Sequence, residues 1–250
     1  MRKIPELVFI IPSYNEEKRI GTGAYFLQLS EHNQVSLLFV NDGSNDNTQQ
    51  VLDSLASKID GKVLRLTPNL GKAEAVRLGA LQSLSEQSSQ YIGFLDCDGA
   101  FPVDTVTDFI EKSIKILSSQ NTVDAVISSR IKLAGRDVKR TASRHYISRV
   151  LITFIGFVIP ELPYDSQSGL KIFRNTKELR DSLSKPFQTK WFFDIELLLR
   201  TGWIDKHRIW EEPVLAWRDV EGSHLNWKKI PALLGEIWIV IKLGWANRAK

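Results

Sequence analysis

The sequence predicts an α/β fold built on a doubly wound, mostly parallel sheet. Short apolar segments rich in β-branched residues alternate along the first half of the chain with longer segments whose apolar residues recur at helical spacing. Elements that alternate in this way form parallel sheets covered by helices on both faces. The 250 residues, of which 43% are hydrophobic and 25% charged, are enough for one such domain.

Five strands are expected in the first half, each bounded by turn-forming residues. They are Leu7 to Ile11, Val35 to Val40, Lys62 to Leu66, Tyr91 to Leu95 and Val123 to Ser128. The helices between them are expected to end near Ser30, to carry Val51 through Ile59 and Val76 through Leu84, and to begin with Pro102 in the first turn.

The regular alternation stops after Ser129. Here the pattern predicts helices over Arg144 to Ile159 and Phe193 to Arg200, a strand over Val214 to Trp217, and an apolar segment from Ile230 to Ala246. We therefore expect one domain over residues 1–250, with a first half over 1–129, a second half over 130–227 and a C-terminal apolar helix over 228–250.

Composition excludes several classes of protein. One cysteine allows neither an internal disulfide nor a zinc–thiolate cluster, and the four histidines show no ligand spacing. No apolar stretch reaches the ~18 residues of a spanning helix, and no signal peptide is expected because a strand starts within a few residues of the N-terminus. Between Arg130 and Arg149 there are seven basic residues and one acidic one, which favours a phosphate-bearing or lipid partner.

Polar loops follow four of the predicted strands. They are Pro12 to Glu17, Asn41 to Thr48, Asn69 to Lys72 and Asp96 to Ala100. Because parallel strands end at the same edge of a sheet, these loops should border one crevice. Asp96 and Asp98 offer the oxygen ligands that Mg²⁺ or Mn²⁺ prefers, and Lys72 after Gly71 could meet a phosphate.

Taken alone, the composition of the Asp96-Cys97-Asp98 stretch favours a solvated turn over a metal site. The chain has no Gly-x-Gly-x-x-Gly and no Walker sequence, which argues against a dinucleotide-binding fold and a P-loop ATPase. It also has no nucleic-acid-binding motif. The nature of the ligand therefore depends on the motifs taken as a set.

The ordered set of motifs resembles the inverting family 2 glycosyltransferases with the GT-A fold. The first half contributes Pro12-Ser13-Tyr14-Asn15-Glu16-Glu17, Asn41-Asp42-Gly43-Ser44, Asn69-Leu70-Gly71-Lys72 and Asp96-Cys97-Asp98. The second half contributes Ser129-Arg130, Arg144-x-x-x-Ser148, Asp165 through Lys171, Trp191 through Leu198, and Pro213-Val214-x-x-Trp217. Within that family these motifs are similar to polyprenyl-phosphate enzymes, and Gly99-Ala100 is more similar to dolichyl-phosphate glucosyltransferases than to mannosyltransferases.

The resemblance implies a nucleoside-diphosphate sugar donor such as UDP-glucose. The donor site would be formed by Pro12, Tyr14, Glu16, Asp42, Lys72 and Asp96. Asp98, with Asp96, would hold Mg²⁺ or Mn²⁺ on the diphosphate. Asp96 and Asp98 are thus candidate catalytic residues, as is Asp194, which occupies the position of a catalytic base in other members but could simply orient basic groups or sugar hydroxyls.

The acceptor implied by the resemblance is a polyprenyl or dolichyl phosphate. Arg130, Arg144 and Ser148 match the acceptor-phosphate residues, and Arg suits bidentate phosphate contacts. The surrounding pocket would be formed by Asp165, Gln167, Lys171, Glu196 and His224. The family usually has Lys at the position of His224, which leaves a phosphate contact there in question.

The sequence therefore predicts a metal-dependent hexosyltransferase that moves a hexose, expected to be glucose, to a polyprenyl phosphate with inversion. The alternatives are a transferase of the same family with a polysaccharide, protein or small-molecule acceptor, and a noncatalytic sugar-nucleotide-binding subunit. The apolar and basic stretches predict a peripheral or monotopic protein with interfacial helices on the cytoplasmic face of a membrane. The sequence does not set the oligomeric state.

Overall fold

The computed structural model confirms an α/β fold around a mostly parallel sheet. It describes residues 6–59, 61–86, 89–140, 152–204, 206–220 and 230–248. The described helices are α1 (Glu17–Ile20), α2 (Ala24–Ser30), α3 (Thr48–Ile59), α4 (Lys72–Glu86), α5 (Val103–Ser119), α7 (Lys177–Leu183), α8 (Phe193–Arg200) and α9 (Ile230–Arg248). Residues 152–158 are also helical.

The main sheet contains seven strands in the order β3-β2-β1-β4-β7-β5-β8. The strands are β1 (Leu7–Ser13), β2 (Val35–Asp42), β3 (Lys62–Leu66), β4 (Tyr91–Leu95), β5 (Ala125–Ser129), β7 (Leu170–Arg174) and β8 (Ile209–Pro213). All neighbours are parallel except that β7 runs antiparallel to β4 and β5. A small parallel sheet pairs β6 (Asp137–Lys139) with β9 (Ala216–Arg218).

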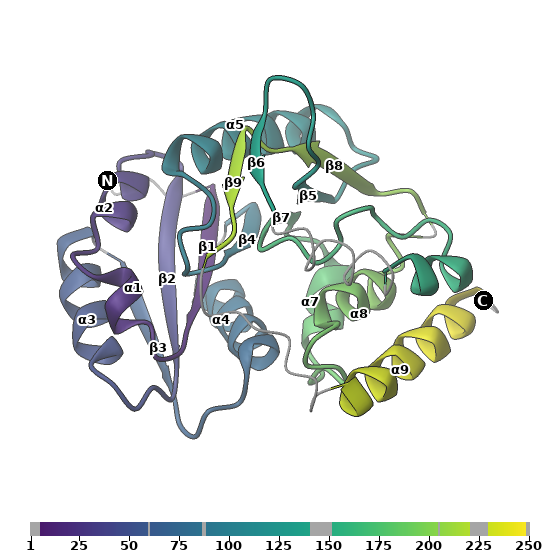
Figure 1. Ribbon diagram of the computed structural model, residues 1–250, viewed down its shortest axis with the longest axis horizontal. Helices are drawn as coiled ribbons and strands as arrows, with labels where there is room; N and C mark the ends of the chain where they lie inside the picture. The colour runs from purple at the N-terminus through teal and green to yellow at the C-terminus, as the bar shows by residue number, and fades with distance from the viewer. Residues whose placement is uncertain are drawn as a thin grey trace.

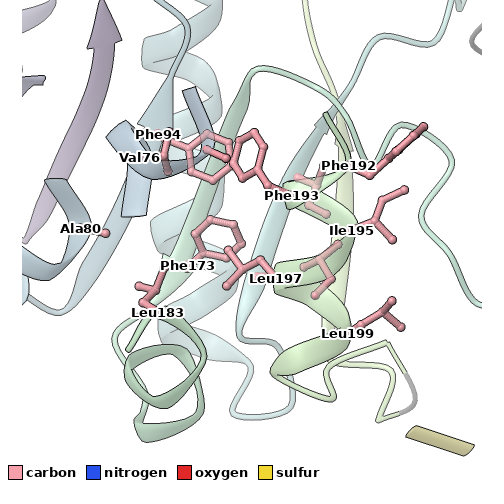
Figure 2. Close-up of a cluster of buried hydrophobic side chains, with 14 of the residues drawn as sticks. Val76, Ala80, Phe94, Phe173, Leu183, Phe192, Phe193, Ile195, Leu197 and Leu199 are labelled. Carbon is pink, nitrogen blue, oxygen red and sulfur yellow. The ribbon is translucent and has the colours of Figure 1, made fainter. Parts of the chain in front are cut away.

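Helices cover both faces of the main sheet, as the alternation of elements predicts. Val8 and Ile10 of β1 point into one buried cluster with residues of α4, α7, α8 and α9. Leu7 and Phe9 point into the other cluster, with residues of α2, α3 and α5. Figure 1 shows α4, α7 and α8 grouped apart from α2 and α5, and Figure 2 shows part of the first cluster between the sheet and α8.

The second half of the chain inserts strand β7 into the sheet between β4 and β5, an arrangement that the sequence pattern did not predict. Lys171 is the second residue of this strand and breaks its apolar pattern. The strand predicted over Val214 to Trp217 is displaced, because Val214 lies between β8, which was not predicted, and β9. The prediction that Pro102 begins a helix is confirmed, since it directly precedes α5.

The predicted helix over Arg144 to Ile159 lies partly outside the described residues, and the predicted pocket residue His224 lies wholly outside them. Among the helices that are described, none has both the length and the apolar character needed to cross a membrane.

Candidate active site

The polar loops meet at one edge of the main sheet because of its strand directions. Strands β1, β2, β4 and β5 are oriented alike, so their carboxyl ends share that edge. Strand β7 runs the other way, which places the loop before it at the same edge. Leu170 is paired with Leu95, and the Asp96 amide donates to the carbonyl of Gly169 at 2.9 Å. Two segments more than seventy residues apart therefore adjoin here.

Asp96 and Lys72 form an ion pair across this edge, with Nζ 2.6 Å from Oδ1. Lys72 is the first residue of α4, so its ammonium lies near the positive end of a helix dipole. Burial would lower the pKa of Lys72, but the charges of Asp96 and Asp194 outweigh it and raise the pKa. The lysine is thus held charged at a place suited to a diphosphate.

Asp98 lies two residues beyond Asp96, and its Oδ1 accepts a hydrogen bond from the Ala100 amide at 3.0 Å. Burial and the neighbouring charge of Asp96 raise the pKa of Asp98. A divalent cation would relieve both effects, so the pair fits Mg²⁺ or Mn²⁺ held with substrate phosphates. Within the described residues, no group of three His, Cys, Asp or Glu side chains could hold a metal.

The buried Asp42 carboxylate holds the loop that leads to Lys72. It accepts hydrogen bonds from the amides of Leu70 and Gly71, each at 2.8 Å. The Asn69 side-chain amide donates to the Asp42 carbonyl at 2.9 Å. Direct contact of Asp42 with a nucleoside stays a prediction, since both carboxylate oxygens are occupied by the chain itself.

The loop after β1 carries the other predicted donor residues. Pro12 is half-buried in the strand, and Tyr14 beyond it is exposed. Glu16 accepts two hydrogen bonds from Arg19, at 2.8 and 3.0 Å, while its amide donates to Thr48 Oγ1 at 2.8 Å. Burial raises the pKa of Glu16 although Arg19 opposes the shift. The loop is thus fixed to the start of α3 with Tyr14 left open to a ligand.

A basic corner follows β5. The Arg130 guanidinium donates to both carboxylate oxygens of Asp165, at 2.8 and 2.7 Å, and its amide donates to Asp165 Oδ2 at 2.8 Å. Arg140 reaches the same carboxylate at 3.3 Å. Both guanidiniums lie over the Trp217 ring, at 5.1 and 5.6 Å from its centroid. The guanidiniums of Arg130 and Arg140 thus share the Asp165 carboxylate at the sheet edge.

Lys171 and Asp194 form a buried ion pair, with Nζ 2.7 Å from Oδ1. The Lys171 ammonium also donates to the Ser168 carbonyl and lies 4.8 Å from the centroid of the Phe94 ring. Burial lowers the pKa of Lys171 and raises that of Asp194, in each case against the pull of the partner. The pair joins β7 to the first turn of α8.

The other predicted pocket residues differ in what they contact. The Gln167 side-chain amide donates to the Trp191 carbonyl at 3.1 Å. The buried Glu196 accepts from the Thr189 amide and hydroxyl, each at 2.7 Å, and pairs with Arg200. Its carboxylate is therefore used to hold the loop before α8, and a direct pocket role stays a prediction. Arg144, Ser148 and His224 lie outside the described residues.

Two further residues join this site that the sequence did not single out. Arg140 was one member of the basic segment and could not be separated from its neighbours. Glu236 interrupts the apolar C-terminal segment, and its Oε2 accepts from the amides of Lys190, Trp191 and Phe192. A lone acidic residue in an apolar segment was the available signal, but its partners are more than forty residues away.

A glycosyltransferase family 2 model matches residues 8–180, and the chain belongs to that family. It is therefore a glycosyltransferase, and the resemblance noted from the motifs is confirmed.

Similar proteins include dolichyl-phosphate beta-glucosyltransferases. One from Trichomonas vaginalis is 34% identical over 205 residues, covering 76% of this chain and 58% of the relative. The human one is 29% identical over 240 residues, covering 88% of this chain and 69% of the relative. The chain thus spans between half and three quarters of the length of these relatives.

Solved structures with the same fold include glucosyl-3-phosphoglycerate synthase from Mycobacterium tuberculosis. Its complex with UDP has a TM-score of 0.66 at 19% identity, covering 95% of this chain and 79% of that one. Its complex with Mn²⁺, UDP-glucose and phosphoglyceric acid has a TM-score of 0.67 at 18% identity, covering 95% and 78%. At this identity the similarity establishes the GT-A fold alone.

Proposed function

We propose that this protein transfers glucose from UDP-glucose to a dolichyl or other polyprenyl phosphate. The observation that carries the proposal is the pairing at one sheet edge of the Lys72–Asp96 pair and Asp98 with the basic corner of Arg130 and Arg140. The Lys72–Asp96 pair and Asp98 suit a nucleoside diphosphate. The corner of Arg130 and Arg140 suits a second phosphate group. The names of the relatives support glucose and dolichyl phosphate as the particular substrates.

The donor is proposed to bind over residues 1–129. Tyr14 and Glu16 would face the nucleoside, and Lys72 would neutralise charge on the diphosphate. Asp98 and Asp96 would hold Mg²⁺ or Mn²⁺, which supplies electrophilic stabilisation of the departing nucleoside diphosphate. The similar synthase structures, which carry Mn²⁺ with UDP-glucose or Mg²⁺ with UDP, support this assignment.

The acceptor is proposed to bind over residues 130–227. An anionic phosphate oxygen attacks the anomeric carbon in line, the bond from that carbon to the diphosphate oxygen breaks, and UDP leaves with the electron pair. This inverts the anomeric configuration. Arg130, with Arg144 and Ser148, would hold the acceptor phosphate so that its oxygen is aligned for attack. Asp165 fixes the Arg130 guanidinium through two hydrogen bonds.

Asp194 is proposed to orient Lys171 rather than to act as a general base. A polyprenyl phosphate is already ionised near neutral pH, so its attack needs no proton abstraction. The Asp194 carboxylate accepts from the Lys171 ammonium, which would present positive charge beneath the sugar and phosphates. Asp194→Asn would therefore retain measurable transfer, whereas an essential base would lose it entirely.

Helix α9 is proposed to rest on the cytoplasmic face of a membrane. Leu234, Trp238 and Trp245 are each at least half exposed and fall along one stripe of the helix. Lys242 lies over the Trp238 ring at 5.3 Å from its centroid. Tryptophan beside lysine is the composition of interfacial helices. Phe157, 80% exposed on the helical segment 152–158, adds apolar surface nearby.

The proposal is tested by incubating the protein with labelled UDP-glucose, Mg²⁺ and a short polyprenyl phosphate. The expected product is a lipid monophosphate glucose that mild acid releases as free glucose. A panel of free phosphorylated acceptors, oligosaccharides and peptides tests the alternative acceptors. Glucose transfer to any of these, with none to the lipid phosphate, would contradict the proposal.

A further inference from the structure

Glu236 of helix α9 accepts hydrogen bonds from the loop that leads into a different helix, α8. Its Oε2 accepts from the amides of Lys190, Trp191 and Phe192, at 3.1, 2.7 and 3.3 Å. The N-cap residue of α8, Phe192, has no side-chain acceptor of its own. Backbone amides outside helices and strands need an acceptor. Glu236 provides one for these three amides from more than forty residues along the chain.

The segment of residues 190–192 also lies beside residues of the candidate active site. The Trp191 carbonyl accepts from the side-chain amide of Gln167, at 3.1 Å, in the loop before β7. Two residues after Phe192, Asp194 pairs with Lys171 at 2.7 Å. The position of this segment therefore sets where Gln167 and the Lys171 ammonium lie.

Helix α9 lies alongside α8 and faces outward on its other side (Figure 1). The Asn247 side-chain amide donates to the Leu199 carbonyl of α8 at 2.5 Å, so the two helices are joined near both ends. Leu233, Ile237 and Val240 of α9 are buried in the core, whereas Trp238 and Trp245 are about half exposed. The half-buried Glu236 lies on the same helix as the exposed tryptophans.

We propose that Glu236 is a positioning residue that couples the binding of α9 to a lipid surface with the positions of the residues on the acceptor side of the active site. This inference rests on the proposed function, because it takes the membrane as the surface that α9 contacts. When Trp238 and Trp245 insert into the interface, α9 becomes fixed. Its carboxylate then fixes the amides of residues 190–192, and with them Gln167 and the Lys171–Asp194 pair.

A purely structural role of Glu236 in holding this loop predicts a different result. Loss of its hydrogen bonds would then lower the stability of the protein by the same amount with or without lipid, and would affect donor and acceptor binding alike. The inferred role requires that the effect of the residue depend on vesicles and fall on the acceptor.

The test compares the full chain with Glu236→Gln, which removes the charge but keeps one acceptor oxygen. Glu111→Gln, at an exposed position of α5, is the matched control. On vesicles of phosphatidylcholine and phosphatidylserine containing a polyprenyl phosphate, kcat/KM for the lipid should fall about tenfold in Glu236→Gln. The affinity for UDP with Mg²⁺ should stay within about twofold, and the control should match the original protein.

Hydrogen exchange provides a readout that needs no turnover. In the original protein, the amides of residues 190–192 should exchange more slowly when vesicles are added, and Glu236→Gln should lose this dependence on vesicles. An equal vesicle effect in both proteins, or an equal loss of donor and acceptor affinity, would overturn the inference. If the original protein makes no lipid product but shows the exchange difference, the proposed function fails while the coupling through Glu236 stands.

Discussion

Gly169 lies against the side chain of Asp96 so closely that a Cβ at residue 169 would be 2.3 Å from Asp96 Oδ2 and 2.5 Å from Cγ. The Gly169 carbonyl accepts from the Asp96 amide at 2.9 Å, so the backbones cannot separate without breaking this bond. Through this contact, the end of β4 and the loop before β7 set each other's position. The donor and acceptor sides of the site therefore meet at a residue without a side chain.

Gly169→Ala should reduce glucose transfer by about 100-fold, because the added methyl group must displace the Asp96 carboxylate from Lys72. The measurement is steady-state kinetics with UDP-glucose, accompanied by a thermal melt. Gly156→Ala is the matched control, since a Cβ at that position meets nothing within 4 Å. Equal activity of the two variants would mean that the Asp96 position is not important for transfer.

The strand ends of the first half could be predicted because their signals are local. The apolar run from Tyr91 to Leu95 stops at Asp96, and the same pattern precedes Ser13 and Asn41. Because the strands pair in parallel, these residues are expected at one edge of the sheet, and the structure confirms this. The similarity of the motifs to a known family added the donor chemistry, which strand patterns alone do not contain.

The second half was harder to predict because its key contacts are between distant residues. Lys171 reads as a polar break in a strand, but it is buried because Asp194, 23 residues later, pairs with it. Glu196 was expected in the pocket by its place beside Asp194, yet it bonds to the loop before its own helix. Such pairings depend on tertiary packing, which spacing along the sequence does not reveal.

Asp98→Asn should abolish transfer and remove the metal dependence of donor binding. The original protein should bind UDP more tightly with Mn²⁺ than with a chelator, because the cation links the carboxylate to the diphosphate. In the variant, the two affinities should be similar, as titration calorimetry can measure. Asp104→Asn, at an exposed position on α5, is the control and should behave as the original protein. Metal-dependent UDP binding that survives in Asp98→Asn would exclude Asp98 as a ligand.

Lys171→Met should destabilise the protein by about 3–5 kcal/mol, because it leaves the buried Asp194 carboxylate without its ion-pair partner. Urea unfolding at neutral pH measures the change. The double variant Lys171→Met, Asp194→Leu should recover part of the stability, since no buried charge is then left unpaired. A double variant less stable than Lys171→Met would show that the pair is not the source of the effect.

Asp165 should make stability depend on acidic pH. Burial alone would raise the pKa of Asp165, but Arg130 and Arg140 outweigh it and hold the pKa well below the ordinary value of 3.8. A lowered folded pKa stabilises the protein fully above the ordinary value, and this contribution is lost as pH falls below it. Asp165→Asn should thus cost about 3 kcal/mol near pH 6 and less near pH 3.

The measurement for Asp165 is the free energy of unfolding in urea for both proteins at each pH. Asp104→Asn again provides the control, because its carboxylate is exposed on α5. A cost of Asp165→Asn that stays constant down to about pH 3 would show that the Arg130 ion pair does not stabilise the folded state.

Replacing both Trp238 and Trp245 by alanine should weaken binding to anionic vesicles by about tenfold or more, because each removes an exposed ring from the outward stripe of α9. The two rings are in edge-to-face contact with centroids 5.9 Å apart, so they form one apolar surface. Vesicle flotation measures the bound fraction. Trp210→Ala is the matched control, since this tryptophan is also exposed but lies on β8.

The same double variant separates lipid binding from chemistry. With a short polyprenyl phosphate in detergent solution, its kcat should stay near that of the original protein, because both tryptophans are exposed on α9 whereas the Lys171–Asp194 pair is buried. With the acceptor in vesicles, transfer should fall in parallel with binding. Equal flotation of the double variant and Trp210→Ala would show that the outward stripe of α9 does not contact lipid, and would require another surface to bring the active site to its acceptor.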